Sequence, residues 1–180
     1  MNGSATNALT YLVGTLIDLY IAAVLLRLLL QWVRADFYNP LCQFLVKITN
    51  PVLIPLRRVI PSIRRLDTAS VVFMLILEFI GVWIVTEIGG LSMGWLEIAA
   101  FSITKLLMTL LMTYFFLIIV SVILSWLGQG LRHPFVPLVY QLTEPVLRPF
   151  RKVIPPIAGI DLSPLFALIA IRFLILLLGW

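Results

Sequence analysis

The chain has 180 residues, of which 62% are hydrophobic and only 12% charged, with a mean hydropathy of +1.11 and a formal net charge of +5. A water-soluble domain of this length needs far more polar surface, so the composition excludes a soluble globular protein and indicates a membrane protein. The excess of basic residues is interpreted as a signal of membrane topology, and binding to nucleic acid is not expected.

Four apolar segments are long enough to cross a hydrocarbon core of about 30 Å, which takes about 20 helical residues. They cover approximately residues 8–33, 71–88, 101–127 and 162–180. The predicted fold is therefore an all-α membrane protein with four transmembrane helices. Gly89, Gly90 and Gly94, between the second and third spans, are predicted to form a turn.

The loop between the first two spans, residues 34–68, is too apolar to be an ordinary linker. Its first part has apolar residues at i, i+3, i+4 and i+7, the pattern of one face of an amphipathic helix; these are Leu41, Phe44, Leu45 and Ile48. A second short helix is predicted to follow, with an apolar face made of Val52, Leu56, Val59 and Ile60 and with Arg57 and Arg58 outside it. Prolines at positions 51, 55 and 61 are expected to separate and kink the pieces.

A 14-residue sequence block of this loop is repeated later in the chain. NPVLIPLRRVIPSI at residues 50–63 is matched by EPVLRPFRKVIPPI at residues 144–157, an offset of 94 residues that also aligns Tyr20 with Tyr114. The second loop, residues 128–161, repeats both helical patterns, and Asn39 and His133 precede prolines at equivalent helix starts. The chain is therefore predicted to be one two-span unit made twice, at residues 1–90 and 91–180. Because each repeat has an even number of spans, the two repeats are expected to be parallel.

The basic residues gather in the two loops, which hold ten of the 13 lysines and arginines. By the positive-inside bias both loops are expected in the cytoplasm and both termini outside. Two interpretations of the loop helices remain open. In the first interpretation, the loop helices lie in the membrane interface and bind anionic lipid or a partner. In the second, they pack beneath the helix bundle as a structural lid. The candidate binding residues are Arg57, Arg58, Arg148, Arg151 and Lys152.

The repeated block P-V-L-x-P-[LF]-R-[RK]-V-I-P, followed each time by an aspartate (Asp67 and Asp161) at the start of the next span, resembles the YggT family, also called YlmG, as a tandem duplication of the family domain. The resemblance implies a small integral membrane protein. Plastid members are linked to cytochrome b6 haem attachment and nucleoid distribution, and bacterial members to osmotic or cation stress and to division gene neighbourhoods. The resemblance supplies no catalytic residue.

Charged residues within the spans are costly in hydrocarbon, about 2.5–3.5 kcal/mol each on insertion scales, and need partners. Arg27 is expected to extend its guanidinium to the cytoplasmic side. Glu78 and Arg172 are equivalent under the 94-residue offset and carry opposite charge, which suggests an ion pair that docks the two halves. An ion or proton path through Asp18 or Glu78, or a contact between copies of the chain, are the alternatives.

One histidine and one cysteine, His133 and Cys42, cannot form a Cys/His zinc set or a c-type haem attachment motif within one chain. No catalytic residue, cofactor or metal site is therefore predicted, and the protein is not expected to be an enzyme. The predicted function is that of an assembly or scaffold factor of the bacterial inner membrane whose loops bind anionic lipid or a protein partner. A homo-oligomer is also possible. The alternative is a component of cation or osmolyte transport.

Overall fold

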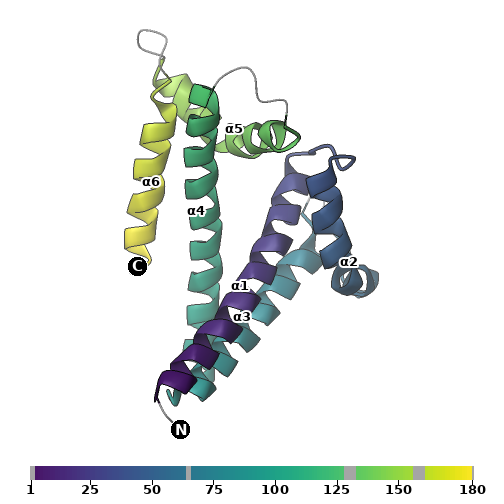
Figure 1. The fold of residues 1–180 in the computed structure, drawn as a ribbon, viewed down its shortest axis with the longest axis vertical. Coiled ribbons are helices and arrows are strands. Elements are labelled where there is room, and N and C mark those ends of the chain that lie inside the picture. The colour runs from purple at the N-terminus through teal and green to yellow at the C-terminus, as the bar shows by residue number, and fades with distance from the viewer. Residues whose placement is uncertain (1–2, 64–65, 128–132, 156–160, 180) are drawn as a thin grey trace. The chain divides into compact units, whose positions relative to one another are not determined.

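The computed structural model describes residues 3–63, 66–127, 133–155 and 161–179, and these residues form an all-helical fold (Figure 1). The helices are α1 (Gly3–Trp32), α2 (Pro40–Val59), α3 (Thr68–Gly89), α4 (Trp95–Leu127), α5 (Phe135–Val153) and α6 (Ser163–Leu177). Among them, α1, α3 and α4 are long and apolar enough to cross a membrane, and α6 is a shorter apolar helix of 15 residues. The prediction of an all-α membrane protein is confirmed, whereas the fourth span stays a prediction.

The helices α1 and α3 lie side by side and antiparallel (Figure 1). A Cβ atom placed on Gly81 would lie 3.0 Å from Cγ2 of Ile17, so any side chain there would crowd this close approach of the two helices. Further along the same contact, the rings of Tyr20 and Phe73 meet edge to face, with their centroids 6.0 Å apart. These contacts fix the register in which α1 and α3 pack.

Two compact units divide the chain, and they do not coincide with the two repeats. The first unit comprises residues 1–28 and 45–109, and the second comprises residues 29–44 and 110–180. The first half of α4 belongs to the first unit because its side chains pack there: the Trp95 ring lies 6.2 Å from the Phe79 ring and 6.3 Å from the Trp83 ring. The predicted boundary between residues 90 and 91 is therefore a boundary of the sequence repeat and not of these compact units.

In the described part of each loop, a single helix runs through both of its inner prolines, so the prediction of two short helices separated by proline breaks was wrong. Pro51 and Pro55 lie inside α2, and Pro145 and Pro149 lie inside α5. A proline inside a helix removes a hydrogen bond and costs about 3 kcal/mol. Burial of Leu53 in α2 and of its repeat equivalent Leu147 in α5, each between the two prolines of its helix, offsets part of this cost.

The predicted helix starts are confirmed. The Asn39 side chain accepts a hydrogen bond of 3.0 Å from the Leu41 amide, and Nδ1 of His133 accepts one of 3.2 Å from the Phe135 amide. The Asn39 side chain also donates 2.7 Å to the carbonyl of Pro134, so the starts of both loop helices meet in the second unit. At the other predicted turn, Gly90 ends α3 with a left-handed φ of 69°, a conformation that favours glycine.

Candidate functional site

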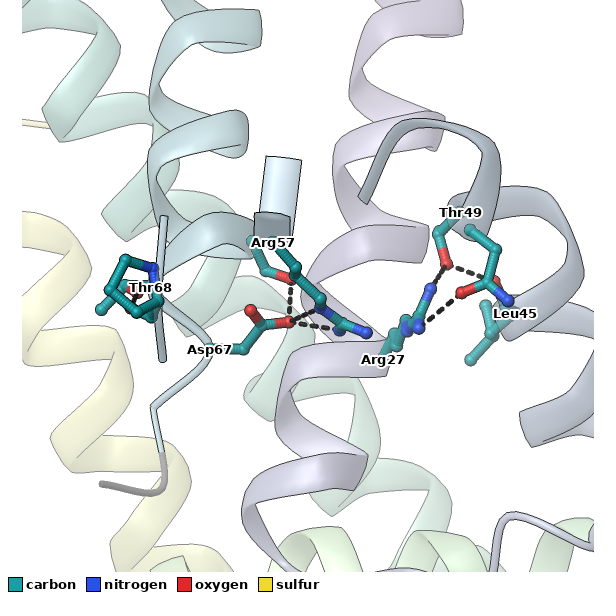
Figure 2. A network of polar contacts seen from close by, with 9 residues as sticks. Arg27, Leu45, Thr49, Arg57, Asp67 and Thr68 are labelled. Carbon is teal, nitrogen blue, oxygen red and sulfur yellow. Dashed lines mark hydrogen bonds and ion pairs between the residues drawn. The ribbon is translucent and has the colours of Figure 1, made fainter. Parts of the chain in front are cut away.

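The first repeat has a polar cluster where α2 ends and α3 begins (Figure 2). Arg57 donates hydrogen bonds from Nε and Nη2 to one carboxylate oxygen of Asp67, with Nε at 3.1 Å. The same oxygen accepts a hydrogen bond of 2.6 Å from the Ser70 hydroxyl. Asp67 is only 1% exposed, so its charge is balanced almost entirely by groups of the protein. This contact joins the repeated motif to the first turn of the following helix.

A second arginine lies beside this pair in Figure 2. Arg27 of α1 donates hydrogen bonds to the Thr49 hydroxyl and, at 2.8 Å, to the Asn50 side-chain oxygen, both on α2. The Tyr20 hydroxyl donates another hydrogen bond from α1 to α2, 3.2 Å to the carbonyl of Ile48. Arg27 is 5% exposed, so α2 and not water binds its guanidinium, and its extension to the cytoplasmic side stays a prediction. The Arg27 guanidinium can be buried because Thr49 and Asn50 of α2 supply oxygen acceptors within its reach.

The second repeat has the equivalent ion pair in a more open setting. Arg151 Nε lies 2.8 Å from the Asp161 carboxylate, and Arg151 Nη1 lies 2.5 Å from the Glu144 carboxylate. The side chains of Asp161 and Arg151 are 38% and 42% exposed. Both repeats therefore use the same arginine and aspartate positions to tie the loop helix to the next helix, but only the first repeat buries the carboxylate.

The pKa values of Asp67 and Asp161 are set by burial and by the groups that donate hydrogen bonds to each carboxylate. Burial raises the pKa of Asp67, but the hydrogen bonds from Arg57 and Ser70 outweigh burial and hold that pKa below its usual value. Burial also raises the pKa of Asp161, and hydrogen bonds from Ser163 and Arg151 outweigh it in the same way. Both aspartates are therefore charged at neutral pH, which makes the two contacts true ion pairs.

The five predicted binding residues divide into two groups. Arg57 and Arg151 are held by ion pairs within their own repeat. In contrast, Arg58, Arg148 and Lys152 are exposed, and within the described ranges they make no hydrogen bond or ion pair. The predicted basic pairs are thus split, and only the second member of each pair is free to meet an outside group.

A third charged cluster lies among α1, α3 and the first half of α4. Lys105 Nζ lies 2.7 Å from an oxygen of Asp18 and 2.6 Å from an oxygen of Glu78, and Glu78 is fully buried. Lys105 is thus the partner that the structure gives to Glu78. Arg172 belongs to the other compact unit, where it is exposed, and its docking with Glu78 stays a prediction.

Two of these roles were not predicted from the sequence, for different reasons. Lys105 is 87 residues from Asp18, and no local pattern links them. The pairing of Arg57 with Asp67 had a usable signal, because the same residue types recur ten residues apart at Arg151 and Asp161. Within the described parts of the chain, no three His, Cys, Asp or Glu side chains are close enough together to hold a metal ion.

These features define a class: an all-helical integral membrane protein in which each repeat ties a proline-containing loop helix to the next helix through an arginine–aspartate pair. The family model described as CCB3/YggT matches the chain twice, at residues 6–88 and 100–180. The chain therefore belongs to the CCB3/YggT family, as a tandem duplication of the family domain.

Several relatives are similar to the chain. An uncharacterised protein of Pseudomonas aeruginosa is 43% identical over 169 residues, which cover 93% of this chain and 86% of that protein. The uncharacterised protein YggT of Escherichia coli K12 is 41% identical over 160 residues, 88% of this chain and 82% of that protein. The chloroplast protein CCB3 of Arabidopsis thaliana, whose name describes cofactor assembly of complex C, is 45% identical over 51 residues, 27% of this chain and 29% of that protein. No solved structure matches the chain.

Proposed function

We propose that this protein is a noncatalytic factor of the bacterial inner membrane, with four spans, whose loop helices α2 and α5 lie amphipathically in the cytoplasmic interface and bind anionic lipid. The membrane-embedded protein would use this contact to hold a partner during assembly. The name of the chloroplast relative, a cofactor assembly protein, supports an assembly role for this chain. The long apolar helices support its place in a membrane.

One observation supports lipid binding above all. An apolar groove of about 670 Å³ lies between the end of α5 and α6, and its lining residues are Pro149, Phe150, Val153, Ile154, Phe166, Ile169, Ala170 and Phe173. Arg148 and Lys152 are exposed, make no ion pair with the residues that the structure describes, and neighbour the groove residues of α5 in the sequence. The apolar groove fits acyl chains, and the exposed basic residues of the same helix, which the helical period places toward its opposite side, are available to an anionic headgroup at the end of α5.

The test is to measure the phospholipid that stays bound to the purified protein, by native mass spectrometry against titrated phosphatidylglycerol. Each basic residue near a membrane surface contributes about 1 kcal/mol, so Arg148→Gln with Lys152→Gln should weaken lipid binding about 20–30-fold. The matched control is Arg151→Gln, which removes the same kind of charge from a residue already held by Glu144 and Asp161. Unchanged lipid binding in the double variant would reduce these residues to topology signals.

The orientation needs a separate test. Cys42 is fully buried, and burial together with the nearby Asp36 raises the pKa of its thiol, so the native cysteine is a poor target for a thiol reagent. Gln43 is exposed, and Gln43→Cys in a Cys42→Ala background supplies an accessible thiol one residue away. An impermeant reagent should label it only after the cells are permeabilised. Labelling in intact cells would overturn the proposed cytoplasmic position of α2.

A second candidate function, cation or osmolyte transport, has one observation in its favour. The charged cluster of Asp18, Glu78 and Lys105 lies among helices that are otherwise apolar, and such groups in a membrane often mark an ion path. If Glu78 conducts, Glu78→Gln should abolish cation flux into proteoliposomes while the protein stays folded. Absence of flux in the unmodified protein would remove this candidate.

A further inference from the structure

The second unit has a polar cavity of about 300 Å³ where α4, α5 and the start of α6 come together. It is lined by Ser121, Val122, Ser125, Trp126, Tyr140, Leu147, Arg151, Asp161 and Pro164. The volume corresponds to about ten times the share of one water molecule in the liquid, about 30 Å³, so a small polar group fits with its hydration. The ion pair of Arg151 and Asp161 forms one part of its wall.

The first repeat identifies the kind of group that suits this space. Under the 94-residue offset, the equivalent of Ser121 is Arg27. Arg27 is 5% exposed, and its guanidinium donates to Thr49 and Asn50 beside an equivalent arginine–aspartate pair. The second repeat therefore keeps the surroundings of a buried guanidinium but replaces the arginine by a serine. The side chain that fills the space in one repeat is absent from the other.

The acceptors around this position are also kept or strengthened. Thr143 is the equivalent of Thr49, and Glu144 is the equivalent of Asn50, which converts a neutral acceptor into a carboxylate. In the first repeat, two arginines face one aspartate, giving a net charge of +1; in the second, Arg151 faces two carboxylates, giving −1. Glu144 does not line the cavity, but together with Asp161 it leaves the cluster around Arg151 with one excess carboxylate, and such an excess favours a cation.

The exposure of the two ion pairs agrees with an incomplete site. The carboxylate side chain is 1% exposed at Asp67, where Arg27 is present, and 38% exposed at Asp161, where it is not. We propose that the cavity lined by Ser121, Arg151 and Asp161 binds a guanidinium group. The planar guanidinium of an arginine offers five N–H donors, for which carboxylate and hydroxyl oxygens are acceptors; in the first repeat, a hydroxyl and an amide oxygen accept from Arg27.

The test is equilibrium dialysis of the purified full chain in lipid nanodiscs against radiolabelled guanidinium. The unmodified protein should bind one equivalent, and Ser121→Arg should bind none, because its own side chain then fills the cavity. Arg27→Ser should bind two, because it opens the equivalent space in the first repeat. The matched control is Gln141→Arg, which adds the same side chain at an exposed position that does not line the cavity and should leave binding unchanged.

Three results would overturn guanidinium binding in this cavity. Ser121→Arg could retain full binding, which would place the ligand elsewhere. Sodium or potassium could displace the label as effectively as unlabelled guanidinium, which would leave only a general cation effect. The unmodified protein could bind nothing while Arg27→Ser binds one equivalent, which would limit the site to the first repeat. Thermal unfolding of each variant shows that it is folded, and Asp161→Asn gives a second way to weaken the site if Ser121→Arg does not fold.

The guanidinium can belong to a partner's arginine or to a small molecule, and a further arm separates these sources. Protein purified from native membranes is compared with the Ser121→Arg variant. A stoichiometric protein that is lost from the variant, and that free guanidinium displaces from the unmodified chain, indicates a partner arginine. Displacement of the label by a small-molecule extract of the cells indicates a guanidinium compound.

Discussion

Replacement of Asp67 and Asp161 by asparagine makes the same chemical change at equivalent positions of the two repeats, with different expected costs. Asp67 is 1% exposed and accepts hydrogen bonds from Arg57 and Ser70. Asp161 is 38% exposed and pairs with an arginine that is 42% exposed. The repeat thus provides its own control, because sequence context and helix position are nearly the same.

The expected magnitudes follow from burial. Breaking a buried ion pair from one side costs about 3–5 kcal/mol because the remaining charge is left without compensation. Arg57 is 31% exposed and can recover part of its hydration, so Asp67→Asn should lower the free energy of unfolding by about 2–3 kcal/mol. An exposed ion pair contributes about 0–1 kcal/mol, so Asp161→Asn should cost less than about 1 kcal/mol.

The assay is unfolding of the purified protein by sodium dodecyl sulfate in mixed micelles, followed by circular dichroism. Thermal melting provides a second measurement, in which the Asp67 variant should melt about 4–12 °C lower than the unmodified chain. The Asp161 variant should stay within a few degrees of it. Equal losses in the two variants, or a larger loss for Asp161→Asn, would refute the assignment of stability to the burial of the first pair.

Three further predictions concern the first unit. Hydrogen bonds to Asp67 outweigh its burial and hold its pKa below the usual value, so the unfolded chain binds the proton more readily than the folded chain. The ion pair should therefore contribute its full stability above about pH 4, and this contribution should be lost as the pH falls through the lowered pKa. The Asp67→Asn variant should lose less stability over the same pH range. Lys105→Met should destabilise the protein more than Glu78→Gln in the detergent unfolding assay, because Lys105→Met leaves the buried Glu78 carboxylate unpaired, whereas Glu78→Gln leaves Lys105 paired with Asp18. Equal losses of stability in the two variants would contradict this pairing. Gly81→Leu should cost about 1–3 kcal/mol by overpacking against Ile17, and Ile17→Ala added to it should recover part of the loss, whereas no recovery would show that the two helices do not meet there.

Much of the fold could be predicted from the sequence because its signals are local. Runs of apolar residues, the 94-residue repeat and the residues before proline located the apolar helices and the starts of the two loop helices. Proline was a misleading local signal. Its cost inside a helix is real, but burial of Leu53 and Leu147 on the same helices is a tertiary effect that a proline pattern does not contain.

The charged clusters were only partly predictable because they depend on contacts between distant segments. Lys105 lies at the margin of an apolar segment in the sequence, and only the packing of α1, α3 and α4 brings it to Asp18 and Glu78. Arg27 could be recognised as an intramembrane charge, but its acceptors on α2 depend on the helix packing. The motif arginines were recognised as a group, although the repeat of the aspartates ten residues later already distinguished Arg57 and Arg151 from their neighbours.

The short length of α6 has a consequence for the surrounding bilayer. Its 15 residues rise about 22 Å, whereas a hydrocarbon core is about 30 Å thick. If α6 crosses the membrane as proposed, lipids beside it must shorten or the two leaflets must bend toward each other, at a cost of a fraction of a kcal/mol per Å of mismatch. The protein would then concentrate in thin patches of membrane, and bilayers built from shorter acyl chains should hold it with less deformation.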